Sequence, residues 1–271
     1  MLEELFFTIK MLLNTLTYKE WLLFCSGSDS RDKKRKELAL KAMSRFENEF
    51  ATFEKCQKAY EYMDELDEIK KILLEGSMTR LAKTFNEWEY IFLGAKELCL
   101  KSIVELSLDN MTKLADNVDS WTFIYLVSDE NTLIENLAKQ KLKEFVCSFE
   151  EWQDLSNKDK RKLKEFSFCE MYRSAKTFDE WFIVYRILRN SRREEEKSVA
   201  FFKMMELMQF KDLLTLTAYS SSMTEFEEFI INKILDSEFT QEQIVSLYDK
   251  CGKDSKVEKF LLSTKLCCRR K

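Results

Sequence analysis

The chain has 271 residues with a net charge of −4 and a sequence pI of about 5.4, and it contains no histidine, no proline and only four glycines. The lack of histidine removes the commonest general base and the commonest zinc ligand. The acidic balance excludes an overall attraction to nucleic acid or anionic membranes. Tight turns and strand boundaries usually need proline and glycine. Hydrophobic residues make up 45% and charged residues 34%, which suits helices with one buried and one wet face. We therefore expect an all-α protein.

The N-terminal stretch 1–16 has apolar side chains at helical spacing, which predicts a first helix that covers the open end of the structure. It carries Glu3, Glu4 and Lys10, unlike a secretory signal, and no stretch approaches the roughly 18 uncharged apolar residues of a transmembrane helix. Most of the eight cysteines stand alone in apolar helical segments, and no CxxC pair exists. Reduced thiols are therefore favoured over a disulfide framework, and we expect a cytoplasmic protein without a membrane partner.

A short pattern, Thr177-Phe178-Asp179-Glu180-Trp181, recurs along the chain. It is typical of a helix start, in which the hydroxyl and the glutamate three residues later each accept a backbone N–H. Equivalent caps can be aligned at Thr17, Thr52, Thr84, Asn117, Ser148, Thr177, Gln209 and Thr240. Their intervals run from 29 to 35 residues, and a near-constant period indicates a repeat protein.

Two further columns support this register. All five tryptophans lie four residues after a cap, at Trp21, Trp88, Trp121, Trp152 and Trp181. An apolar marker lies six residues before most caps, at Met78, Met111, Leu142, Met171 and Ile234. Each repeat is therefore interpreted as helix A, a polar link and helix B, as in the sixth repeat, where helix A is predicted over Phe178 to Leu188 and helix B ends at about Met208.

These patterns predict an all-α fold, an α-solenoid of about eight antiparallel helix pairs with ~29–35 residues per repeat. We expect one helical-repeat domain over 1–271, with an N-terminal helix at 1–16, repeats at 17–266 and a tail at 267–271. The second repeat is the most divergent, since Cys56 replaces the tryptophan. The tail contains Cys267 and Cys268 followed by basic residues. A frayed terminus is favoured there over a palmitoylated pair.

The chain resembles helical-repeat solenoids of the tetratricopeptide and HEAT type, which are arrays of paired antiparallel helices. More narrowly, the Thr-Phe-x-Glu-Trp start with a Met-x-x-Leu-Ala helix end resembles a bacterial TFEEW-type repeat of unassigned role. The resemblance covers about residues 17–266 and implies helix-pair architecture. The tetratricopeptide signature with its terminal proline is not matched, so the peptide-carboxylate clamp of that family is not carried over to these positions.

Two sets of residues have side chains suited to a functional site, but their positions favour structural roles. The tryptophans fit an aromatic ligand groove less well than a core staple, because their position follows the repeat. The Thr/Ser and Glu pairs have catalytic residue types, but their spacing fits helix capping. There is no nucleotide-binding glycine motif and no nucleophile with a histidine partner. We therefore expect no enzyme activity, no cofactor, no metal and no small-molecule substrate.

Basic clusters fall near several links between helices A and B. In a solenoid, equivalent positions share one edge, so these clusters predict a broken basic edge for phosphate or partner binding. Acidic residues interrupt it, and a solvated charged edge is the simpler interpretation. The residues of this predicted basic edge are Arg31, Lys33, Lys34, Arg35, Lys36, Lys158, Lys160, Arg161, Lys162, Arg192 and Arg193.

The expected function is non-enzymatic protein–protein interaction, as an adaptor or a subunit of a larger assembly that binds a protein partner on the solenoid surface. Nucleic-acid binding along the basic edge is the alternative, and an inhibitor that blocks a host complex is another that the sequence does not separate from the first.

Overall fold

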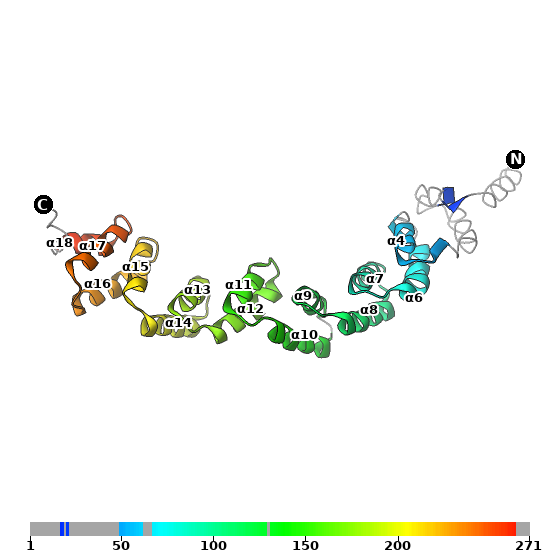
Figure 1. Ribbon diagram of the computed structural model, residues 1–271, viewed down its shortest axis with the longest axis horizontal. Helices are drawn as coiled ribbons and strands as arrows, with labels where there is room; N and C mark the ends of the chain where they lie inside the picture. Colours follow the sequence, from blue (N-terminus) through cyan, green and yellow to red (C-terminus); the bar gives the residue numbers. More distant parts are fainter. Residues whose placement is uncertain (1–16, 19, 22–48, 62–66, 129–130, 264–271) are drawn as a thin grey trace, which may run out of the picture. The chain divides into compact units, whose positions relative to one another are not determined.

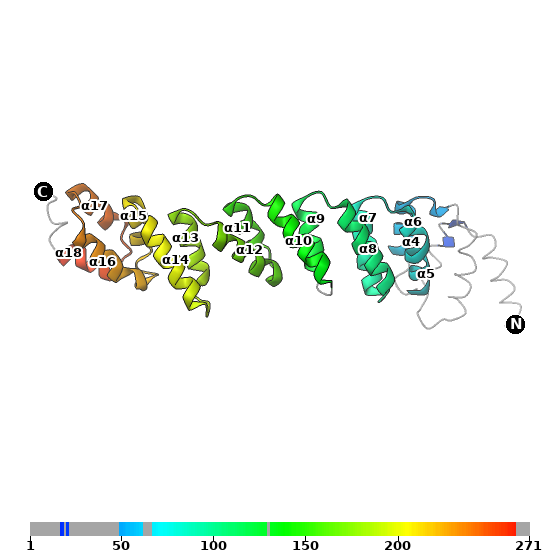
Figure 2. The same cartoon turned by 90° about the horizontal axis from the view of Figure 1, so that it is seen from below.

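The computed structural model describes residues 17–18, 20–21, 49–61, 67–128 and 131–263. The predicted N-terminal helix at 1–16, most of the first repeat and the tail at 267–271 lie outside the described residues. All regular structure in the described part is helical (Figures 1 and 2). The chain divides into two compact units, 1–147 and 148–271. The prediction of one continuous domain is not tested by this division and stays a prediction.

The first unit is a series of helices joined by short links. In chain order they are α4 (Phe53–Glu61), α5 (Asp67–Ile72), the π-helix η2 (Leu73–Met78), α6 (Thr79–Leu81), α7 (Phe85–Glu97), α8 (Lys101–Leu114), α9 (Val118–Val127) and α10 (Thr132–Phe145). Helix α4 pairs with the α5–η2–α6 segment, α7 with α8, and α9 with α10.

The second unit continues the same alternation. Its helices are α11 (Phe149–Asn157), α12 (Arg161–Ser174), α13 (Phe178–Leu188), α14 (Glu194–Leu207), α15 (Phe210–Tyr219), the 3₁₀ turn η3 (Thr224–Phe226), α16 (Glu227–Asp236), α17 (Gln241–Lys250) and α18 (Lys256–Ser263). Helix α11 pairs with α12, α13 with α14, and α15 and α17 precede α16 and α18. The predicted all-α fold of stacked helix pairs is confirmed, and α13 has the predicted bounds.

The junction from one pair to the next is an extended residue followed by a capped helix. Helix B ends where the backbone becomes extended, at Ala82 and Ala115 in the first unit and at Ala175 in the second. Two residues later the cap begins the next helix A. Such a junction reverses the chain without a glycine or a proline, which explains why the composition contains so little of either.

The tryptophan column is the core of the repeats, as predicted. Trp21, Trp88, Trp121, Trp152 and Trp181 are all buried. The ring of Trp152 meets Phe166 of its own helix B edge-on at 5.5 Å, and Trp181 meets Tyr172 of the preceding helix B at 5.4 Å. The tryptophans therefore contribute both to packing within a repeat and to packing between neighbouring repeats.

The apolar marker of helix B is also buried as predicted, since Met78, Met111, Leu142, Met171 and Ile234 are all in the core. A column that the sequence analysis missed lies four residues before the marker. It holds a small, fully buried residue in four successive B helices: Ser107, Ala138 and Ser167, and in α14 Ala200, which lies four residues before the buried Met204. A small side chain there lets helix B approach its neighbours closely.

The second repeat solves the same packing problem differently. Leu74 is fully buried in η2 four residues before Met78, where the other repeats carry a small residue. Space is gained instead on the neighbouring helix α7, at Gly94. A Cβ at Gly94 would lie 2.7 Å from the hydroxyl oxygen of Tyr60 and 3.4 Å from a methyl carbon of Leu74. The glycine therefore leaves room for the end of the Tyr60 side chain, and its backbone conformation is one that any residue adopts.

Replacing Trp181 by alanine should lower the free energy of unfolding by about 3–5 kcal/mol, because a buried aromatic side chain is lost on both sides of a repeat boundary. Urea unfolding followed by circular dichroism measures this. Trp181→Phe, which keeps an aromatic ring, should cost clearly less. A change of only a few tenths of a kcal/mol for Trp181→Ala would contradict the register.

For the column of small buried residues in helix B, we expect a substitution by alanine to have the opposite effect on the free energy of unfolding. The hydroxyl oxygens of Ser107 and Ser167 are buried without a hydrogen-bond partner in the described part of the chain. Ser167→Ala should therefore leave the free energy of unfolding unchanged or raise it by up to about 1 kcal/mol, since an unsatisfied hydroxyl is removed. The matched reverse change, Ala138→Ser, should lower it by about 1–3 kcal/mol. A clear loss of stability in Ser167→Ala, again by urea unfolding, would show that the hydroxyl has a partner.

Candidate interaction surface

The Thr/Ser and Glu pairs form hydrogen bonds to the backbone at helix starts, as predicted from their spacing. In α7 the N–H of Glu87 donates to the hydroxyl oxygen of Thr84 (3.3 Å), and the N–H of Thr84 donates to the carboxylate of Glu87 (2.9 Å). The same reciprocal bonds form at Ser148, Thr177 and Thr240. Because these side chains are committed to helix starts, they do not form a catalytic pair.

The capping glutamate of α7, Glu87, has a lowered pKa. Partial burial of Glu87 alone would raise its pKa. The backbone N–H groups of Lys83 (2.7 Å) and Thr84, the Thr84 hydroxyl and the positive charge of Lys83 outweigh burial, so the pKa lies below 4.5. The folded state therefore holds the charged form of Glu87 more tightly than the unfolded chain does.

This shift makes stability depend on pH in a defined direction. A carboxylate with a lowered folded-state pKa contributes stability that is fully present above its unfolded pKa and is lost as pH falls through the folded pKa. Glu87→Gln, which keeps an acceptor as Gln243 does at Thr240, should flatten the fall in unfolding free energy between about pH 5 and pH 3. The matched reverse change, Gln243→Glu, should steepen it. Urea titrations at several pH values check both, and an unchanged slope in Glu87→Gln would contradict the assignment.

The predicted basic edge is only partly described. Five of its residues, Arg31, Lys33, Lys34, Arg35 and Lys36, lie outside the described residues. The others lie in the second unit, at two links. Lys158 and Lys160 belong to the link before α12, Arg161 and Lys162 to its first turn, and Arg192 and Arg193 to the link before α14.

Much of the charge at these two links is compensated. The guanidinium of Arg193 lies 5.4 Å above the ring of Phe168 on α12 and also pairs with Glu196 at 3.3 Å. Arg161 pairs with Glu165 at 3.1 Å. Within the part of the chain that the structure describes, Lys160 and Arg192 are exposed and have no ion pair. The structure places Arg193 against α12, the helix that begins with Arg161 and Lys162, and the predicted basic edge stays a prediction.

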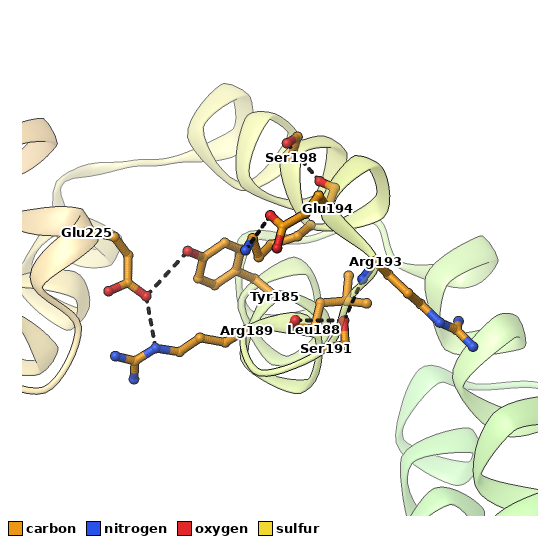
Figure 3. A network of polar contacts seen from close by, with 9 residues as sticks. Tyr185, Leu188, Arg189, Ser191, Arg193, Glu194, Ser198 and Glu225 are labelled. Atoms are coloured by element: carbon orange, nitrogen blue, oxygen red, sulfur yellow. Dashed lines mark hydrogen bonds and ion pairs between the residues drawn. The ribbon is translucent and has the colours of Figure 1, made fainter.

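A polar network joins α13 to the link that follows α15 (Figure 3). The guanidinium of Arg189 pairs with the carboxylate of Glu225 at 3.0 Å and donates to the carbonyl oxygen of Ser222 at 2.7 Å. The same carboxylate accepts the hydroxyl of Tyr185 at 3.4 Å. Burial, with the nearby negative charge of Glu225, raises the pKa of Tyr185 to about 12. The network holds the C-terminal ends of α13 and α15 side by side.

Next to this network an arginine lies across two aromatic rings. The guanidinium carbon of Arg186 is 5.9 Å from the ring centre of Phe182 on α13 and 5.5 Å from that of Tyr219 on α15. The two rings themselves are 5.3 Å apart. Arg186 is exposed, Phe182 is buried, and Tyr219 is 36% exposed. We call Phe182, Arg186 and Tyr219 the arginine–aromatic cluster.

The sequence analysis did not identify this cluster. Phe182 and Arg186 are four residues apart on one helix, which places them on the same face, but that spacing is common in helices. The partner ring, Tyr219, comes from the next repeat. No local pattern links it to Arg186.

The described residues contain no other conventional site. No group of three or more cysteine, aspartate and glutamate side chains in that part of the chain is placed to hold a metal ion. None of its helices has the length and apolar character needed to cross a membrane. Comparisons with family models, with curated proteins and with solved structures gave no match.

Proposed function

We propose that the protein is a non-enzymatic interaction module, an adaptor or a subunit of a larger assembly, that binds a protein partner along its helix-pair surface. The observation that supports this is a repeated exposure of large apolar side chains on helix B. Leu106 and Leu137 are the sixth residues of α8 and α10, and Leu114 and Phe145 are the last. All four are between 38% and 42% exposed.

Scattered apolar side chains are normal on protein surfaces. These four residues differ because they occupy equivalent positions in two helices. Successive B helices of the first unit present the same two positions to solvent. A stack of repeats turns such positions into rows, and extended rows are the binding surfaces of helical-repeat proteins. We also propose that the chain is related to tetratricopeptide or HEAT repeat proteins and that it is located in the cytoplasm.

A second candidate is nucleic-acid binding along the basic edge. It is favoured by Lys160 and Arg192, which are exposed at neighbouring links of the second unit and lack an ion pair in the described part. Backbone phosphates would be held there by counterion release, with affinity that falls steeply as salt rises.

The proposed function is tested by affinity capture of the tagged protein from the lysate of its own host, with and without nuclease. We expect a stoichiometric protein partner that survives nuclease. The pair Leu106→Ser and Leu137→Ser should lose it, because two apolar contacts are removed from one surface. A matched pair at adjacent exposed polar positions, Glu105→Ser and Asn136→Ser, should retain it.

The nuclease arm separates the two candidates. Three results would together favour nucleic-acid binding over protein binding. They are recovery of RNA or DNA, loss of partners on nuclease treatment, and loss of binding in the double variant Lys160→Glu with Arg161→Glu. Binding that survives reversal of Lys33, Lys34, Lys160 and Arg161 would end the nucleic-acid alternative.

A further inference from the structure

The arginine–aromatic cluster lies on the first helices of two successive repeats. Arg189, at the end of α13, binds the carbonyl oxygen of Ser222, just past the end of α15. The C-terminal ends of the two helices therefore lie together, and the helices run in the same direction. Phe182, one turn before Arg186, forms the floor of the cluster against Tyr219.

Arg186 differs from three other arginines of this unit, and unlike the unpaired Arg192 it lies against two aromatic rings. Arg161, Arg189 and Arg193 each pair with a glutamate. Within the described residues Arg186 has no carboxylate partner, and its contacts are the two ring faces. Stacking on aromatic rings leaves the N–H donors of a guanidinium at the ring edge, where they remain able to bind a carboxylate in a bidentate way.

The neighbouring surface of α15 favours the same kind of ligand. The exposed position next to Tyr219 on α15 is Ala218, which is small and uncharged. The exposed Lys211 lies in the first turn of α15, about 12 Å along the axis from Tyr219. Lys211 also has no ion pair in the part of the chain that the structure describes, so α13 and α15 combine two uncompensated cations with an exposed aromatic ring.

We propose that the arginine–aromatic cluster binds an acidic peptide segment of a protein partner. A carboxylate of the segment pairs with Arg186, and an apolar side chain beside that carboxylate packs on the ring of Tyr219. Arginine and tyrosine are the residue types that dominate binding energy at protein interfaces. The inference rests on the proposed function and names the chemistry of the partner.

An acidic peptide fits this surface better than a nucleic-acid backbone. Nucleic acids present a continuous series of phosphates and need several cations along one track. Among the described residues, α13 and α15 carry one cation each, Arg186 and Lys211, so no series of cations follows either helix.

The test uses the full chain and a fluorescein-labelled peptide, Glu-Leu-Glu-Phe-Glu-Leu-Glu, followed by fluorescence anisotropy. The wild type should bind it, and Arg186→Glu should weaken binding at least about tenfold, because an attraction becomes a repulsion. Tyr219→Ala should weaken it too. The affinity of Arg186→Lys should lie between those of the wild type and Arg186→Glu, because the positive charge remains and the planar group that stacks on the rings is lost. The same peptide with glutamine in place of glutamate should bind weakly to all variants.

The matched control is Arg173→Glu, an equal charge change at an exposed arginine of the same unit, on α12. It should leave the affinity unchanged, and circular dichroism should show the same helix content in every variant. Absence of wild-type binding, equal affinity in Arg186→Glu, or an equal loss in Arg173→Glu would each overturn the inference. A labelled oligothymidylate provides a further control. If it competes with the peptide and its binding is lost in Arg186→Glu, the cluster binds nucleic acid and the inference is overturned. A captured protein partner retained by Arg186→Glu would leave the proposed function standing and refute this site alone.

Discussion

The buried tryptophan four residues after each capped helix start is the interaction on which the repeats depend. The cap fixes where helix A begins, because its side chain and the glutamate three residues later satisfy backbone N–H groups that a helix start leaves unpaired. That fixed start sets the face on which the tryptophan lies. Trp152 packs on its own helix B and Trp181 on the preceding one. A local hydrogen-bond pattern thus determines a contact between repeats.

What the sequence predicted well was local in origin. The caps, the bounds of α13 and the buried Met78 and Met111 follow from hydrogen bonds and apolar spacing within a few residues. The column of Ser107 and its equivalents was missed because small residues fit a surface as well as a core. The cluster of Arg186 and Tyr219 was missed because its two halves are 33 residues apart, on helices whose proximity only packing establishes.

Charge is arranged on the described links so that most cations have a nearby carboxylate. Arg161 and Glu165 are four residues apart on α12, and Arg193 and Glu196 are three apart at the start of α14. Such exposed pairs contribute little to stability, but they reduce the net field of the edge. Composition alone cannot show this, because it counts charges without their partners. An arginine held by ring faces alone, as Arg186 is, stands out only against that compensated background.

The π-helix η2 in the second repeat shows how such a chain tolerates a change in length. A π-helical turn takes one more residue per turn than an α-helix, so a single extra residue is accommodated inside the helix. Lys70 before it, Leu74 within it and Met78 at its end are nevertheless all buried. The repeat from Thr52 to Thr84 therefore keeps buried residues before, within and at the end of its π-helical segment. In this architecture a helix, as well as a link, can hold one more residue without exposing the apolar positions around it.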